Sequence, residues 1–200
     1  MIIISYFTKN TPYERVMQSR LLPSLVFWKL PYNIQGVPDL GSWQKNTSFK
    51  AQFIYDMLLK HKQDVCFIDA DATILKYPHL LFEIPEDYIL AAHKLDWNLL
   101  WRKQQGNSKR EFLSGTMVFK YNNLGLELAQ RYVEECNKST NWEQKILQNI
   151  IEYNPIYKLY ELPPEYCCII MRDGKIPTWY CKNPVILHWQ ASRVYKNKKQ

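Results

Sequence analysis

Residues 64–78 read DVCFIDADATILKYP. The apolar run VCFI is typical of a buried strand, and Asp69 and Asp71 follow it directly. In an extended chain, residues i and i+2 point to the same side, so the two carboxylates can lie together. Two carboxylates this close repel each other unless a positive charge neutralises them, and their oxygens suit Mg²⁺ or Mn²⁺. A turn or helix cap built from aspartates is the alternative, which the apolar residues on both sides disfavour.

The rest of the chain alternates between apolar runs and amphipathic segments. We predict strands at residues 1–7, 65–70, 88–94, 112–120 and 184–190, and helices at residues 11–22, 48–62, 124–136 and 141–153. This alternation predicts an α/β fold with a mostly parallel central sheet and helices on both faces, in one domain over residues 1–200. In such sheets ligands bind at the carboxyl ends of the strands, which is where Asp69 and Asp71 stand. Residues 190–200 are a candidate for a flexible basic tail.

Composition limits the classes of protein and partner. No apolar run reaches the roughly 18 residues of a membrane span, and the opening MIIISYF lacks the features of a signal peptide, so we expect a cytoplasmic protein. The five cysteines include no C-x-x-C pair, which argues against a thiolate zinc site and for reduced thiols. The net charge of +7 favours nucleic acid, an acidic membrane surface or a phosphate-bearing ligand.

A second polar group follows another predicted strand, in NPVILHWQASRVYK (183–196). His188 stands at the strand end, and Ser192 and Arg193 follow. Arginine binds phosphate oxygens with two parallel hydrogen bonds, so these residues could form a diphosphate clamp. A metal held by Asp69, Asp71 and His188 would complete such a site. A histidine in this position is otherwise most often a packed side chain.

The segment 93–111 combines aromatic and basic residues with a Gly-Asn-Ser turn signal. Trp97, Trp101 and Arg102 could bind an acceptor by stacking on bases or sugar rings and pairing with phosphates. The alternative is a loop that covers the core and exposes a charged flank.

Six segments in chain order also match a known family: YFTKNTPYE (6–14), GSWQKNTSFKAQFI (41–54), FIDADATI (67–74), LSGTMVFK (113–120), NWEQKIL (141–147) and ILHWQASRVYK (186–196). In these segments the chain resembles the nucleotide-diphospho-sugar transferases of the GT-A fold, in particular small phage and bacterial proteins with a D-x-D motif. The resemblance implies a glycosyltransferase that uses a nucleotide-sugar donor. If the protein is encoded by a phage, it would lie in the cytoplasm of the host.

The resemblance also implies a role for each matching residue. Asp69, Asp71 and His188 would hold Mn²⁺ or Mg²⁺. Donor contacts would come from Tyr6, Phe7, Thr8, Lys50 and Asp69 around the nucleotide, Ser114 and Gly115 at the sugar, and Gln190, Ser192 and Arg193 at the diphosphate.

Glu143 and Gln144 match the position where relatives keep an Asp-Gln pair near the reacting carbon, so the resemblance implies a catalytic role. An equally good interpretation is a pair of capping boxes, Thr140-x-x-Glu143 and Asn141-x-x-Gln144. The relatives imply retention of the anomeric configuration. The acceptor stays open between a DNA base, as in phage relatives, and a glycan or protein. A metal-dependent nuclease or a non-enzymatic nucleic-acid-binding protein is the alternative function.

Overall fold

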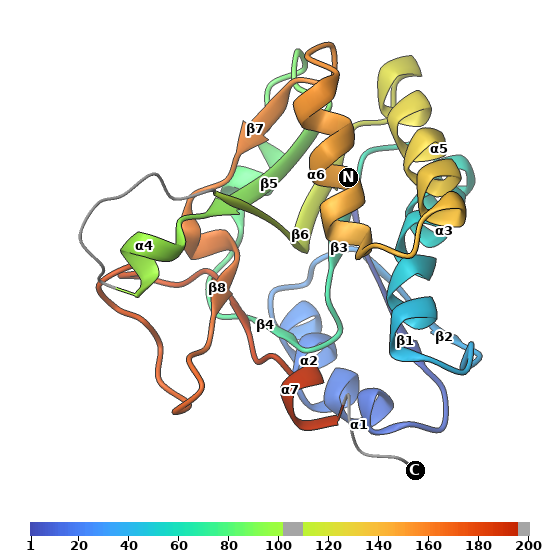
Figure 1. Ribbon diagram of the computed structural model, residues 1–200. Helices are drawn as coiled ribbons and strands as arrows, with labels where there is room; N and C mark the ends of the chain where they lie inside the picture. The colour runs from blue at the N-terminus through green and yellow to red at the C-terminus, as the bar shows by residue number, and fades with distance from the viewer. Residues whose placement is uncertain (102–109, 196–200) are drawn as a thin grey trace.

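The computed structural model describes residues 1–101 and 110–195, and the main sheet lies at its centre (Figure 1). The sheet has the strand order β2-β1-β3-β6-β5-β7. Its strands are β1 (Ile2–Thr8), β2 (Tyr32–Val37), β3 (Val65–Ile68), β5 (Leu90–Leu95), β6 (Glu111–Phe119) and β7 (Leu159–Glu161). All pairs are parallel except those that β6 makes with β3 and β5. The prediction of a mostly parallel sheet is therefore confirmed.

The reversed direction of β6 determines what lies at the carboxyl edge of the sheet. In the antiparallel register Ile68 of β3 pairs with Thr116, and Leu95 of β5 pairs with Glu111. The first half of β6 therefore lies beside the residues that end β3 and β5. This places Ser114 and Gly115 next to the aspartates that follow β3.

A second, three-stranded sheet has the order β4-β9-β8, with β4 (Ala72–Ile74), β8 (Cys168–Ile169) and β9 (Ile186–His188). The apolar run at 184–190 thus belongs to this small sheet and not to the main one. The reason is its partner, since β9 pairs antiparallel with β4, the short strand directly after the two aspartates. The pairing sets His188 opposite Ala72.

Helices cover both faces of the main sheet, as predicted. One face packs against α3 (Trp43–His61), α5 (Asn123–Lys138) and α6 (Glu143–Tyr153), and the other against α2 (Leu21–Phe27) and the small sheet. The remaining helices are α1 (Pro12–Ser19), α4 (Trp97–Leu100), α7 (Ser192–Tyr195) and the 3₁₀ turns η1 (His79–Phe82) and η2 (Pro164–Tyr166). Alternate residues of each strand supply the two cores, for example Ile4 to one and Ile3 to the other.

Two helix boundaries differ from the prediction for local reasons. The expected helix at 11–22 is broken at Arg20, because Pro23 has no N–H to donate and fits only into the first turn of a new helix, α2. Helix α3 begins five residues early, at Trp43, because the Ser42 hydroxyl caps it by accepting from the Lys45 amide at 3.2 Å.

Three further expectations concern the C-terminal segment, the cysteines and membrane crossing. Of residues 190–200, where a tail was expected, Ser192–Tyr195 form α7, and 196–200 lie outside the described residues. The five cysteines are free thiols buried in the protein. Within the ranges that the structure describes, no helix has both the length and the apolar character that a membrane crossing needs.

Gly125 makes the start of α5 possible. Its amide donates to the Asn122 side chain, the cap of the helix, at 2.8 Å. A Cβ atom at this position would lie 1.9 Å from the carbonyl oxygen of Lys120. The backbone before the helix therefore passes too close for any side chain.

We expect Gly125→Ala to lower the free energy of unfolding by about 1–3 kcal/mol, because the added methyl overpacks this contact. The sign is diagnostic, since Gly→Ala inside an unobstructed helix stabilises by roughly 0.5–1 kcal/mol. Urea denaturation measures the difference. Asn137→Ala, at an exposed position of the same helix, serves as the control and should change stability by less than about 0.5 kcal/mol. A more stable Gly125→Ala protein would contradict the packing described here.

Candidate functional site

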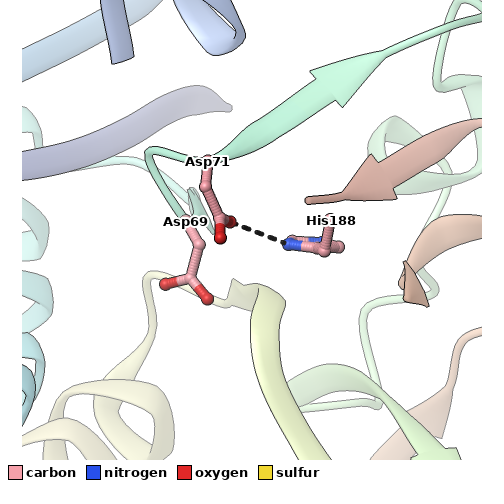
Figure 2. A group of neighbouring side chains, drawn as sticks. All are labelled: Asp69, Asp71 and His188. Carbon is pink, nitrogen blue, oxygen red and sulfur yellow. Dashed lines mark ion pairs between the residues drawn. The ribbon is translucent and has the colours of Figure 1, made fainter. Parts of the chain in front are cut away.

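Two aspartates and a histidine converge where β3 ends (Figure 2). The Asp69 amide donates to the Gly115 carbonyl at 2.9 Å, and the Ala72 amide donates to the Asp69 carbonyl at 3.0 Å, which closes a tight turn. The pairing of β4 with β9 then brings His188 to the same place. One ligand atom of each of Asp69, Asp71 and His188 lies within 4.8 Å of the others. Asp71 Oδ1 and His188 Nδ1 are 3.9 Å apart.

The Asp71 carboxylate is oriented by the segment that follows β9. Its Oδ2 accepts from the Ala191 amide at 2.7 Å, and its carbonyl accepts from the Trp189 amide at 3.2 Å. Burial by itself would raise the pKa of Asp71, but His188 and the Ala191 amide together hold this pKa below its usual value. Asp71 is therefore ionised at neutral pH and faces the imidazole.

The space between these three side chains depends on Gly115. A Cβ atom there would lie 2.9 Å from His188 Cε1 and 3.2 Å from Asp69 Oδ2. His188 is held by a hydrogen bond of 2.9 Å between its Nε2 and Thr116 Oγ1, which leaves Nδ1 on the side of Asp71. Two carboxylates and an oriented imidazole are a donor set suited to a divalent cation. The residues present therefore fit a metal ion.

Lys50 extends from α3 into a group of acceptors beside the aspartates. Its ammonium lies 3.1 Å from Asp69 Oδ1, 3.0 Å from Glu143 Oε1 and 3.0 Å from Ser114 Oγ. Burial alone would lower the pKa of Lys50, but the Asp69 and Glu143 carboxylates raise it above its usual value. The pKa of Asp69 is raised by its partial burial and by Asp71, with Lys50 opposing the shift. Lys50 is thus a buried cation that links three chain segments.

Glu143 and Gln144 do not act as capping residues, so the capping-box interpretation is wrong. The N-cap of α6 is Trp142, which makes no side-chain capping bond. Glu143 Oε1 instead accepts from the Ser114 hydroxyl at 2.9 Å, and Gln144 Oε1 accepts from the Ser114 amide at 3.2 Å. Both side chains turn inward, toward Lys50 and β6. Glu143 Oε2 is buried and has no hydrogen-bond partner among the described residues.

The three predicted nucleotide contacts at the end of β1, Tyr6, Phe7 and Thr8, differ in how deeply they are buried. The Tyr6 hydroxyl donates to the Asn46 carbonyl at 2.7 Å, and its ring packs against Phe49, Phe53 and Phe67. The Tyr6 ring is therefore part of the core under α3. Phe7 is half-buried, and Thr8, at the carboxyl end of the strand, is buried.

Tyr13 lies near this site, although the resemblance of segment 6–14 gave it no role of its own. Burial, together with the charges of Asp71 and Asp69, raises the pKa of Tyr13 to about 12. The Tyr13 hydroxyl therefore lies within electrostatic range of both aspartates. Tyr13 stands in the first turn of α1, where the Thr11 hydroxyl accepts from its amide at 3.3 Å.

The predicted diphosphate segment lies directly after β9. Gln190 adopts the left-handed conformation, with φ of 54°, and so turns the chain toward Asp71. Ser192 begins α7. Arg193 Nη1 donates to the Ile170 carbonyl at 2.8 Å, which anchors its side chain, and burial lowers the pKa of Arg193. One of five N–H groups of this guanidinium is used in that bond.

The predicted acceptor residues are partly described. Trp97 and Trp101 stack on each other, with ring centroids 5.9 Å apart and an interplanar angle of 8°. Arg102 lies outside the described residues. Glu111 connects the pair to the site, because it accepts from Trp97 Nε1 at 2.5 Å and from Gln144 Nε2 at 2.7 Å.

Comparisons with solved structures place this fold among glycosyltransferases. A glycosyltransferase involved in the glycosylation of the major capsid of PBCV-1 is similar with a TM-score of 0.68 and 14% identity, over 94% of this chain and 92% of that chain. Mouse xyloside xylosyltransferase 1 gives a TM-score of 0.57 and 12% identity, over 96% of this chain and 99% of that one. Galactosyltransferase LgtC, solved with donor and acceptor sugar analogs, gives a TM-score of 0.54 and 12% identity, over 95% of this chain and 87% of that chain.

At these identities the likeness shows the fold alone, which is the GT-A fold. A comparison with curated protein sequences gives no match. The sequence model of one family, however, matches residues 38–200, a span that includes both aspartates, Lys50, Glu143 and His188. The chain therefore belongs to the nucleotide-diphospho-sugar transferase family.

Proposed function

We propose that this glycosyltransferase depends on a divalent metal and moves a sugar, with retention of configuration, from a nucleoside-diphosphate donor to a glycan acceptor. The observation that carries the proposal is the convergence of Asp69, Asp71 and His188 around the space that Gly115 leaves open. This donor set lies at the carboxyl edge of the sheet, beside a buried carboxylate oxygen of Glu143 that has no partner in the described chain.

Asp69, Asp71 and His188 would hold Mn²⁺ or Mg²⁺, which when bound supplies positive charge to the departing diphosphate. Gln190, Ser192 and Arg193 follow His188 within five residues, on the turn and the short helix α7 after β9, and we propose that they bind the diphosphate oxygens. The guanidinium of Arg193 is anchored at one N–H and can offer others to an anion. Charge that develops on the leaving group would thus meet fixed donors.

The sugar would lie between this turn and the start of α6. Ser114 and Gly115 form one wall, and Lys50 keeps Glu143 and Asp69 at fixed positions on either side of its ammonium. Glu143 Oε2 is buried and has no hydrogen-bond partner in the described residues, and we propose that it meets a sugar hydroxyl or positive charge at the anomeric carbon when the donor is bound. Gln144 stands next to it on α6.

We propose a glycan acceptor in place of the DNA base that the sequence resemblance had suggested. The proteins with similar structures include a xyloside xylosyltransferase and a galactosyltransferase solved with an acceptor sugar analog. The candidate acceptor residues Trp97 and Trp101 present a stacked aromatic pair, which suits sugar rings as well as bases. Transfer assays with labelled donor, comparing oligosaccharides with DNA, distinguish the two acceptors.

The metal site is tested by Asp71→Asn. A neutral amide is a poor ligand for Mn²⁺, so metal-dependent hydrolysis of the donor should fall by at least about 100-fold while the fold persists. Release of nucleoside diphosphate from a panel of UDP-, GDP- and dTDP-sugars, titrated with Mn²⁺, measures this. In the wild type, Mn²⁺ and nucleoside diphosphate together should raise the melting temperature more than either alone.

Gly115→Ala tests the same site without changing a ligand, because its methyl would fill the space between His188 and Asp69. It should raise the Mn²⁺ concentration needed for half-maximal activity by about 10-fold or more. The control for Asp71→Asn is Asp56→Asn, which makes the same change at an exposed position of α3 and should behave as wild type. Wild-type metal dependence in Asp71→Asn would reject the assignment.

Glu143→Gln tests the role of the buried carboxylate. If Glu143 stabilises charge only in the transition state, kcat should fall on the order of 10²–10³-fold and the KM for the donor should change little. The control is Glu134→Gln on the exposed face of α5. A variant that raises KM at an unchanged kcat would show that Glu143 only helps to bind the donor.

Retention is the stereochemistry of the family members that the sequence resembles, and we propose it for this chain. Lys50 and Ser114 hold Glu143 Oε1 in place, which suits a carboxylate that stabilises positive charge at the anomeric carbon. We therefore expect an α-linked donor to yield the α-sugar first. Proton NMR during donor hydrolysis, recorded before mutarotation, reads the anomer, and initial formation of the β-sugar would exclude retention.

A further inference from the structure

A wide groove of about 1050 Å³ runs along α6, beside the site. Its lining residues on α6 run from Gln144 past Gln148 and Asn149 to Tyr153 at the end of the helix, and Lys94 of β5 and Glu111 of β6 also line it. Neither Gln148, Asn149 nor Tyr153 has a part in the donor chemistry described above. The groove therefore needs its own explanation.

The groove and the candidate active site share a wall. Gln144 lines the groove and also accepts from the amide of Ser114, whose hydroxyl is bonded to Glu143. Trp142, another lining residue, directly precedes Glu143 and packs edge-on against Trp43, with ring centroids 6.0 Å apart. A molecule in the groove would thus reach the residues next to the reacting carbon.

The side chains along the groove are of types that suit sugar rings. Trp142 and Tyr153 are 53% and 82% exposed, and Trp97 presents the ring that stacks on Trp101. Aromatic faces offer broad apolar contact to the C–H side of a sugar ring. Gln148 and Asn149 add amide groups that can both donate to and accept from hydroxyls.

The charge of the groove argues against an anionic ligand. Among its described lining residues three are basic and three acidic: Lys94, Arg110, Lys145, Glu111, Glu152 and Glu161. The Arg110 guanidinium is moreover paired with Glu161, with Nη1 2.8 Å from Oε2. Binding of a polyanion gains its free energy from an excess of Lys and Arg side chains, which these described lining residues do not supply. The net charge of +7 of the whole chain is therefore not concentrated among the described residues of the groove.

We propose that this groove binds the acceptor, and that the acceptor is an uncharged oligosaccharide of two or more sugar units with its reactive hydroxyl toward Gln144. The volume of the groove is at the upper end of the volumes of pockets that enclose a drug-sized ligand. It is therefore larger than a single sugar ring would fill. The proposal rests on the proposed function, since it names the acceptor of the same reaction.

The test uses the full chain in EDTA without any donor. Neutral trisaccharides (maltotriose, cellotriose, xylotriose and chitotriose) are compared with a sulfated trisaccharide and a 12-nucleotide single-stranded DNA. Saturation-transfer NMR detects binding, and tryptophan fluorescence gives Kd at 50 and 300 mM NaCl. We expect at least one neutral trisaccharide to bind with a Kd that changes less than twofold with salt. Trp142→Ala should weaken its binding at least fivefold, and Asn149→Ala about threefold.

Phe27→Ala is the matched control. Phe27 is a 72% exposed aromatic residue on α2, which packs against the opposite face of the sheet from α6. Its removal should leave saccharide binding unchanged. Binding restricted to DNA or to the sulfated sugar, no binding by any neutral trisaccharide, or an undiminished affinity in Trp142→Ala would each overturn the proposal.

A separate measurement keeps this proposal apart from the proposed function. The wild type is melted with Mn²⁺ and nucleoside diphosphate. A rise in melting temperature without saccharide binding rejects the acceptor groove alone. Saccharide binding that Trp142→Ala weakens, without any such rise, supports the groove and rejects the proposed metal-dependent donor site.

Discussion

The buried ammonium of Lys50 is the interaction on which the site depends. It enters from α3 and contacts Asp69 after β3, Ser114 on β6 and Glu143 at the start of α6. A charge removed from water in this way is tolerated only when it is paired and fully hydrogen-bonded, so its partners have defined positions. The same contacts that satisfy Lys50 therefore set the distance between the candidate metal ligands and the candidate catalytic carboxylate.

Two features of the fold make this convergence possible. The reversed β6 carries Ser114 and Gly115 to the carboxyl edge, where a parallel strand would have ended in different residues. The small sheet then brings His188 back to the loop after β3. Both arrangements serve the same edge of the main sheet, where open α/β proteins bind their ligands.

Membership of the nucleotide-diphospho-sugar transferase family decides among the functions that the sequence had left open. The chain is a nucleotide-sugar glycosyltransferase, neither a nuclease nor a non-enzymatic nucleic-acid-binding protein. The positive net charge, which had favoured a nucleic-acid partner, has no counterpart in the groove along α6, where the described basic and acidic side chains balance.

By itself the sequence determined the class of fold, the apolar strand before Asp69 and Asp71, and the candidate ligands, because periodicity and the i, i+2 relation are local properties. It left Glu143 and Gln144 equally open to a catalytic and a capping role, and it gave Tyr13, within the matched segment 6–14, no role of its own. Only the tertiary structure decided which polar groups meet, since Asp71 is bonded to an amide 120 residues away, at Ala191. Such contacts depend on how strands pair across the whole chain, and local sequence patterns carry no information about that pairing.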